Sequence, residues 1–145
     1  MKKIINKNAY REYSIEDKIE AGIKLTGAEV KAIRTRGVQL KDAFVRLEDN
    51  QAYLINANIN PYPFARRDEQ EPKRKRKLLL RKNQIKSLKD AKKAKLTIVP
   101  LACYTKGRWI KVLLGIGKRK TKHQKKKDLI KKEQEKKMRQ LKKEF

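Results

Sequence analysis

Positive charge is concentrated in two stretches of this 145-residue chain, and this concentration limits what the chain can fold into. Residues 73–93 contain eleven Lys or Arg and one acid, whereas residues 117–145 contain fourteen Lys or Arg and four acids. The two stretches together hold twenty of the 26 net positive charges. Because so much like charge repels itself, we expect a polyanionic partner, with nucleic acid ahead of a membrane surface. The folded core must come mainly from the other residues.

The length and apolar content of the chain allow one core of modest size. Only 38% of the 145 residues are hydrophobic, so we expect one domain in residues 1–116 and a basic C-terminal tail in residues 117–145. No apolar run approaches the roughly 18 to 20 residues that span a bilayer. The N-terminus lacks the apolar segment of a secretory signal. We therefore expect a monomeric, cytoplasmic protein that is not bound to a membrane.

Short apolar runs separated by turn residues predict that the body is built mostly from strands. Three pairs of strands are predicted, over residues 13–15 with 19–25, 43–47 with 52–55, and 96–104 with 109–114. Pro100 cannot donate to a backbone ladder, so it marks an edge or a bulge. We expect an all-β-dominated fold, a small OB-like barrel with two or three short flanking helices.

Two helices are predicted within the body. Thr26 and Glu29 form a capping box, in which each side chain accepts a hydrogen bond from the backbone N–H of the other residue. A second helix begins near Asn83 and turns Ile85 and Leu88 toward the core. Its outer face carries lysines at positions Lys86, Lys89, Lys92 and Lys93.

The tail, residues 117–145, has little apolar surface to bury. Its composition predicts disorder in the free protein, and its good helix formers predict a helix against a partner. An amphipathic helix on a membrane is the alternative, but the apolar face is thin. A basic segment that folds on RNA is the interpretation we favour.

The residues that commonly carry catalysis or bind metals are sparse and scattered. His123 is the only histidine and has no His or Cys at metal-ligand spacing, so contact with an RNA base or phosphate is the better interpretation. Cys103 is the only cysteine and lies in an apolar strand pattern, which favours a buried structural role. Residues 115–118 lack the full pattern of a phosphate-binding loop. We therefore expect no enzyme activity, no metal and no cofactor.

The basic run Lys73–Lys77, directly before Leu78–Leu80, predicts contact with nucleic-acid phosphates. A solvated charge run is the alternative, which the repeated charge of the tail makes less attractive. Tyr10, Tyr62 and Phe64 are candidates for stacking on bases, although packing in the core explains each equally well. Composition does not separate RNA from DNA.

Four motifs occur in order over almost the whole chain. They are Asn6–Ala9 with Tyr13–Ile15, Glu20–Lys31, Pro72–Leu80, and Val99–Leu101 with Tyr104. The second and third are long and specific. In sequence and order these motifs resemble the SsrA-binding (small protein B) proteins.

The resemblance implies a non-enzymatic adaptor that binds the tRNA-like domain of transfer-messenger RNA and delivers it to stalled ribosomes for trans-translation. It also implies that body and RNA together mimic a tRNA in the decoding centre of the 70S ribosome. The tail of such proteins becomes a helix in the empty mRNA channel and reports that no codon is present.

Family contacts with RNA map onto Asn6, Glu20 and Leu79. Glu20 can accept hydrogen bonds from base edges or 2′-hydroxyls, which gives specificity that lysines cannot. A surface acid paired with a local Lys is the alternative. The predicted RNA-binding residues are Asn6, Lys7, Glu20, Lys73, Arg74, Arg76, Lys77, Leu79 and Arg81. The predicted tail contacts with the ribosome and mRNA channel are Lys118, Lys120, His123, Lys125, Lys126, Lys131, Lys132, Lys136, Lys137 and Arg139.

The root of the tail departs from the family pattern, which has Tyr or His followed by Asp-Lys-Arg. His123 keeps the aromatic position, but Gln124 replaces the Asp and Lys126 replaces the Arg. Gln124 still accepts a hydrogen bond without a negative charge, whereas Lys126 lacks the planar fork that grips a phosphate in two places.

Two other classes of protein compete with the adaptor. A ribosomal protein or rRNA-bound translation factor would have similar charge and size, and only the specific motifs argue against it. An RNA-modifying enzyme would need a cofactor loop or an acid–base group, and the sequence offers none that is evident.

Overall fold

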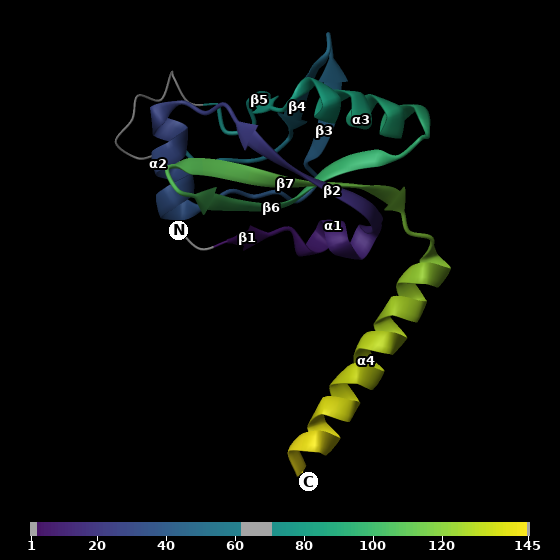
Figure 1. Cartoon of the computed structure of the whole chain (residues 1–145). Helices are drawn as coiled ribbons and strands as arrows, with labels where there is room; N and C mark the ends of the chain where they lie inside the picture. Colours follow the sequence, from purple (N-terminus) through teal and green to yellow (C-terminus); the bar gives the residue numbers. More distant parts are fainter. Residues whose placement is uncertain (1–2, 62–70, 145) are drawn as a thin grey trace.

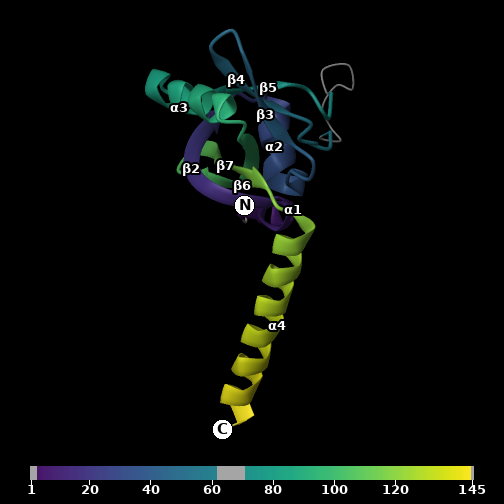
Figure 2. The same ribbon diagram turned by 90° about the vertical axis from the view of Figure 1, so that its right-hand side faces the viewer.

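The computed structural model describes residues 3–61 and 71–144, and within them seven strands form one antiparallel sheet (Figure 1). The strands are β1 (Ile4–Ile5), β2 (Tyr13–Ile23), β3 (Phe44–Glu48), β4 (Gln51–Ile55), β5 (Arg76–Leu79), β6 (Thr97–Lys106) and β7 (Trp109–Arg119). The helices are α1 (Lys7–Glu12), α2 (Gly27–Arg36), α3 (Lys82–Lys93) and α4 (Lys122–Glu144). In Figures 1 and 2, α1 and α3 lie on opposite sides of the strands, and α4 projects away from the body.

The all-β-dominated body is confirmed, but the expected OB-like barrel is not closed. The strand order is β1-β6-β7-β2-β5-β4-β3, and across residues 3–61 and 71–144 no ladder joins β1 to β3. The sheet curves enough to bring β3 into contact with β6. Side chains with 2% exposure or less fill the inside of this curve, among them Val45, Leu54, Leu78, Leu88, Ile98 and Leu114.

The two predicted hairpins are confirmed. In the first, Glu48 pairs with Gln51, and the intervening Asp49 and Asn50 have the positive φ values of a tight hairpin turn. In the second, Lys106 pairs with Trp109 across a turn at 107–108. Pro100 lies at a shift in register, as its missing N–H predicted.

The predicted pair of strands over residues 13–25 is wrong, because residues 13–23 form the single strand β2. Its register shifts between Ile15 and Asp17, where three consecutive polar residues lie exposed. A bulge places an extra residue in one strand without ending the pairing, so this polar stretch did not need to be a turn. Strand β7 likewise runs on to Arg119, beyond its predicted end at 114.

Both predicted helices are present. The backbone N–H of Thr26 donates to Glu29 Oε1 (3.0 Å), and the N–H of Glu29 donates to Thr26 Oγ1 (3.2 Å), so the capping box is confirmed. Helix α3 buries Ile85 and Leu88 at 8% and 0% exposure. The short helix α1 begins after Asn6, whose Oδ1 accepts from the N–H of Ala9 (3.3 Å), a typical N-cap.

Candidate nucleic-acid interface

A row of residues from four strands crosses the sheet on the face opposite the core. Tyr104 pairs with Lys111, Lys111 pairs with Gly22, and Gly22 pairs with Leu79. Directly paired residues share a face of a sheet, and alternate residues point to the other face. Val112, next to Lys111 in β7, is accordingly buried at 1% exposure. The row therefore faces solvent across β6, β7, β2 and β5.

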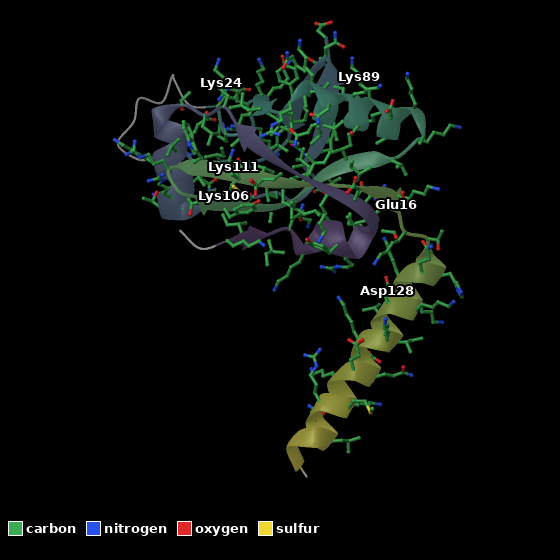
Figure 3. All side chains as sticks on the ribbon, in the orientation of Figure 1. Glu16, Lys24, Lys89, Lys106, Lys111 and Asp128 are labelled. Atoms are coloured by element: carbon green, nitrogen blue, oxygen red, sulfur yellow. The ribbon has the colours of Figure 1, made fainter. Side chains whose placement is uncertain are left out.

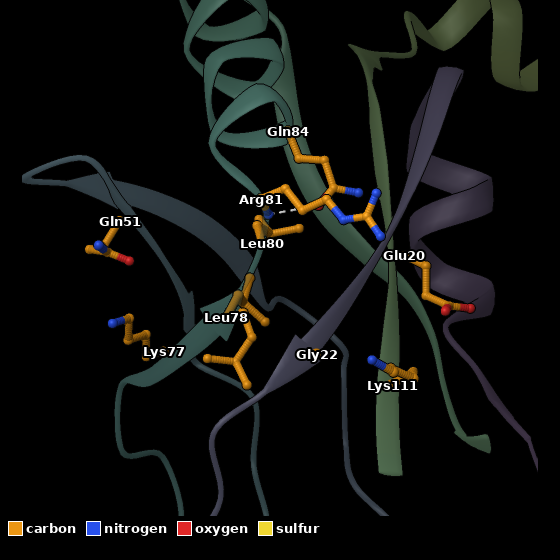
Figure 4. A pocket seen from close by; sticks show the side chains of 10 residues that line it. Glu20, Gly22, Gln51, Lys77, Leu78, Leu80, Arg81, Gln84 and Lys111 are labelled. Atoms are coloured by element: carbon orange, nitrogen blue, oxygen red, sulfur yellow. Dashed lines mark hydrogen bonds between the residues drawn. The ribbon is translucent and has the colours of Figure 1, made fainter. Parts of the chain in front are cut away.

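Gly22 is the residue of this row that has no side chain. A Cβ at Gly22 would come within 3.2 Å of the Cβ of Leu79 and 3.6 Å of Nζ of Lys111. Gly22 lies in a surface groove of about 640 Å³, which we call the Gly22 groove. Its lining is shown in Figure 4 and consists of Glu20, Gly22, Gln51, Lys77, Leu78, Leu79, Leu80, Arg81, Gln84 and Lys111.

The Gly22 groove combines an exposed apolar side chain with three cationic side chains. Leu79 is 52% exposed, so its apolar side chain is accessible at the groove. Lys77, Arg81 and Lys111 bring three positive charges to the same opening. Phosphates suit such cations, and an exposed apolar side chain suits the face of a base or sugar. The sequence predicted Lys77, Leu79 and Arg81 for the RNA interface, and the structure brings these three together.

Glu20 is the acidic residue of this groove and is held by two neighbours from β6. The hydroxyl of Tyr104 donates to one carboxylate oxygen, and Nζ of Lys106 lies 3.3 Å from the other. The hydrogen bond from Tyr104 holds the pKa of Glu20 below its usual value, with help from Lys106 and against the opposing effect of burial. Burial, and then the bond to Glu20, raises the pKa of Tyr104 to about 12.

These contacts leave Glu20 ionised and fixed in direction. Its side chain remains 35% exposed, and a carboxylate has more lone pairs than Tyr104 and Lys106 use. The alternative interpretation, an acid paired with a local Lys, therefore describes the contact with Lys106, and the partly exposed carboxylate can still accept further hydrogen bonds.

The predicted residues Asn6, Lys7 and Lys73 lie at a second groove of about 610 Å³, away from Glu20. Asn6 is 7% exposed. Its amide donates to the carbonyls of Leu40 (3.1 Å) and Pro100 (2.9 Å), which uses both amide hydrogens. Asn6 thus caps α1 and ties it to the sheet, whereas Lys7 and Lys73 are exposed.

Arg76 was predicted to contact RNA, and its burial corrects that prediction. The side chain is 0% exposed, with Nε donating to Glu29 Oε2 at 2.6 Å and the rest of the guanidinium bound to backbone carbonyls. Arg74 binds the other oxygen of Glu29 and is half-buried. Burial alone would raise the pKa of Glu29, but hydrogen bonds from Arg74, Thr26 and Arg76 hold it below its usual value.

The alternation of a strand explains this division of the basic run. In β5, Arg76 and Leu78 point into the core, whereas Lys77 and Leu79 point outward. An unbroken row of Lys and Arg hides that alternation, because both faces carry the same charge. Our sequence predictions missed the groove residues Gly22, Lys111 and Gln84. Strand pairing brings Gly22 and Lys111 beside Leu79, and Gln84 comes from the first turn of α3.

Helix α4 begins with hydrogen bonds that join it to the body. The N–H of Thr121 donates to Gln124 Oε1 (3.0 Å), and the N–H of Gln124 donates to Thr121 Oγ1 (3.2 Å), which is a capping box. Nζ of Lys125 lies 2.6 Å from Glu12 of α1, and Lys120 pairs with Asp128. Figure 3 labels Asp128 in this first part of α4.

Beyond this root the predicted tail residues are surrounded by solvent. Lys118 belongs to β7, where it pairs with Ser14, and Lys120 lies between β7 and α4. The exposed predicted residues of α4 are His123, Lys126, Lys131, Lys132, Lys136, Lys137 and Arg139.

The described residues also settle where several other residues and features considered in the sequence lie. No group of three or more His, Cys, Asp or Glu within residues 3–61 and 71–144 could hold a metal ion. Cys103 is buried as predicted, and burial raises the pKa of its thiol to about 12. In the same residues, no helix is both long and apolar enough to cross a membrane. Tyr10 is 38% exposed, whereas Tyr62 and Phe64 lie outside the described residues.

The family model described as SmpB protein matches residues 3–144 of this chain. An SsrA-binding protein of Streptococcus thermophilus is 46% identical over 131 residues, which cover 90% of this chain and 85% of the relative. An SsrA-binding protein of Elusimicrobium minutum is 49% identical over 116 residues, which cover 79% of this chain and 74% of the relative.

Similarity extends to three-dimensional structure. A chain of the solved structure “tmRNA-SmpB: a journey to the center of the bacterial ribosome” is 40% identical, with a TM-score of 0.69. The match covers 83% of the present chain and 85% of the solved one. The resemblance carried by the four sequence motifs is thus confirmed along nearly the whole length. Sequence, family model and fold agree, and the chain belongs to the SmpB family.

Proposed function

We propose that this protein is a non-enzymatic RNA-binding adaptor that takes transfer-messenger RNA, held by its tRNA-like domain, to stalled 70S ribosomes for trans-translation. Its relatives are named for binding SsrA, and the similar solved structure is named for tmRNA and SmpB in the bacterial ribosome. The observation that carries the proposal is the Gly22 groove, where cations, an exposed Leu79 and an oriented Glu20 meet. In this role the protein acts as a monomer in the cytoplasm.

Each kind of side chain in the Gly22 groove has a separate task in this proposal. Lys77, Arg81 and Lys111 neutralise phosphates, which provides affinity but little discrimination. Leu79 packs against a base or sugar. Glu20 accepts hydrogen bonds from base edges or 2′-hydroxyls. An RNA without a donor at this position would leave the partly buried carboxylate without a partner, which costs binding free energy. Lys7 and Lys73 add phosphate contacts at the second groove, on the same body.

The tail has a different task. Residues 117–145 lie in the mRNA channel next to the decoding centre, as a helix that senses the absence of a codon. Helix α4 has 23 residues and a length of about 35 Å, enough to follow a channel for several codons. Since solvent surrounds it beyond its root, most of it is disordered in the free protein and gains order on the ribosome.

Competition for RNA tests the proposal. The tRNA-like domain of transfer-messenger RNA, labelled at one end, is bound at physiological salt and challenged with an excess of ordinary tRNA. The proposal requires retention of the labelled RNA against a large excess of tRNA. Equal competition would mean binding driven by charge alone, and a ribosomal-protein role would replace the adaptor.

A further inference from the structure

Trp109, at the start of β7, is exposed to an extent that is rare for its type. Its exposed fraction is 69%, whereas that of Tyr10 is 38%. Tryptophan is usually largely buried, so an indole exposed to solvent leaves its apolar ring surface available for contact with a partner. Its backbone is nevertheless fixed, because Trp109 pairs with Lys106 across a turn in which Gly107 has a φ of 62°. The ring is therefore presented from a rigid point.

The sheet register places Trp109 on the same surface as the Gly22 groove. Residues two apart in a strand share a face, so Trp109 and Lys111 of β7 point the same way. Ile110, between them, is buried at 6% exposure. Lys111 lines the Gly22 groove, and its strand partner is Gly22 itself. One continuous surface thus runs from the groove to the tip of the β6–β7 hairpin.

Basic residues neighbour Trp109 in the hairpin. Lys106, its strand partner, has a side chain 68% exposed, and Figure 3 shows Lys106 and Lys111 on neighbouring strands near α2. Arg108 precedes Trp109, and its carbonyl accepts from Nη2 of Arg34 at 3.3 Å, which ties the tip to α2. An apolar protein partner would have to desolvate these charges, whereas a polyanion with flat rings would use both the charges and the indole.

Other aromatic rings of the body already have a cation over one face. Lys3 lies 5.5 Å from the ring centre of Tyr104, Lys18 lies 5.7 Å from that of Tyr10, and an equivalent contact of 4.5 Å joins Lys75 to Tyr53. Trp109, with more than two thirds of its surface exposed, is the ring best placed to receive a base.

We propose that the indole of Trp109 stacks on an unpaired base of the bound RNA, as a second contact that extends the interface beyond the Gly22 groove. This inference rests on the proposed RNA-binding function. Stacking of one base on an aromatic side chain changes affinity by roughly five- to a hundred-fold and does not depend on which base is present. Arg108, next to Trp109 in the chain, neutralises a phosphate beside the stacked nucleotide.

Trp109 is the single tryptophan of the chain, so its fluorescence reports on this position alone. The probe is the tRNA-like domain of transfer-messenger RNA, labelled so that its anisotropy measures binding independently. On saturation we expect strong quenching of Trp109 emission and a several-fold lower rate of quenching by acrylamide. Emission that keeps its intensity and its acrylamide accessibility while the RNA is bound would overturn the inference.

Substitutions of Trp109 and Lys111 separate the effect of ring stacking on RNA affinity from the effects of side-chain size and of positive charge. Trp109→Leu keeps an apolar side chain without a ring and should weaken binding roughly ten-fold, whereas Trp109→Phe should retain part of the affinity. Neither should alter the salt dependence of binding. Lys111→Ala, the matched change on the same face, should reduce the salt slope by about one. Leu129→Ala, in exposed α4, serves as a control that leaves binding unchanged.

The outcomes also distinguish this inference from the proposed function. If labelled RNA binds selectively while Trp109→Leu binds as tightly as the native protein, stacking is wrong and the adaptor role stands. If no selective binding occurs even with Trp109 intact, the proposed function itself fails. A thermal unfolding curve for each variant shows that a loss of affinity does not come from loss of the fold.

Discussion

At the scale of single residues, the contact between Glu29 and Arg76 joins α2 to β5 inside the protein. Removing two charges from water is costly, and their attraction repays it only when the remaining polar atoms also find partners. Arg76 meets that condition, since Nη1 donates to Ala57 O (2.9 Å) and Nη2 donates to Pro72 O (3.0 Å). Glu29 meets it through Thr26 and Arg74.

Glu29→Gln should therefore destabilise the protein by about 3 kcal/mol, because Arg76 would remain buried with its charge uncompensated. Urea unfolding at neutral pH measures this. Since folding lowers the pKa of Glu29, its contribution is complete above the pKa of the unfolded chain and is lost as pH falls through the lower folded pKa. The difference between native protein and variant should thus shrink in acid.

Glu48→Gln is the matched control for this experiment. Glu48 pairs with Lys75 at 2.8 Å on the surface near the same strand, where solvent screens the charges, so little change in stability is expected. Equal destabilisation by the two substitutions would contradict the special position of Glu29.

The hydroxyl of Tyr104 donates a hydrogen bond to Glu20 and orients its carboxylate, so we expect Tyr104 to influence RNA binding through Glu20. Tyr104→Phe should raise the pKa of Glu20 and reduce the preference for the tRNA-like domain over ordinary tRNA. The salt slope should stay the same, since no cation is removed. Carboxyl NMR titration together with the competition assay checks both effects.

Glu20→Ala is the reference for that variant and should reduce the same preference further. If Glu20→Ala weakens binding of all RNAs equally, Glu20 does not contribute to specificity.

At the scale of elements, the root of α4 shows how a neutral residue can begin a helix in a strongly basic segment. Gln124 occupies the third helical position and completes the capping box with Thr121. Glutamine is accepted there as readily as glutamate, because the box needs an acceptor and not a charge. Gln124, which stands where the family pattern has Asp, therefore still supports the start of α4.

Gln124→Ala should weaken the start of α4 by about 1 kcal/mol, a typical value for loss of a cap contact. Hydrogen exchange of the amides at 122–126 should become several-fold faster in the free protein. Gln124→Glu keeps the box and adds a negative charge at the positive end of the helix, so exchange should slow instead. Identical exchange in all three proteins would show that the box does not hold this end of α4.

At the scale of the whole molecule, the body and the tail both carry strong positive charge but differ in what fixes their shape. The body has a core that spans the curved sheet, whereas α4 leaves that body after contacts at its root (Figure 2). Deleting residues 122–145 removes α4 and leaves β7 intact to Arg119.

This deletion should leave binding of the tRNA-like domain nearly unchanged, with a smaller salt slope, and should abolish peptide tagging on stalled ribosomes. Competition binding and a tagging assay measure the two effects. A protein that still tags without α4 would contradict the role proposed for the tail. Deletion from 118 is a less clean test, because it also removes Lys118 and Arg119 from their pairs with Ser14 and Tyr13.

Features that depend on neighbouring residues were predictable from the sequence alone. The capping box of Thr26 and Glu29, the hairpin at 49–50 and the bulge at Pro100 each follow from side chains a few positions apart. The separate charge of body and tail also follows from order in the chain. Local geometry decides these features, and it is the same wherever the segment lies in the fold.

Tertiary structure decided which members of each pattern lie on the proposed RNA-binding surface and which lie in the core. Only pairing between strands shows that Arg76 turns inward and Lys77 outward, that Gly22 opens a groove beside Leu79, and that Tyr104 reaches Glu20 across 84 positions of sequence. In the sequence, Trp109 likewise looks like any other strand residue, and only the structure shows that it lies on the solvent-facing side of the sheet. Pairing register depends on the whole core, because a shift of one residue exchanges the two faces of every strand.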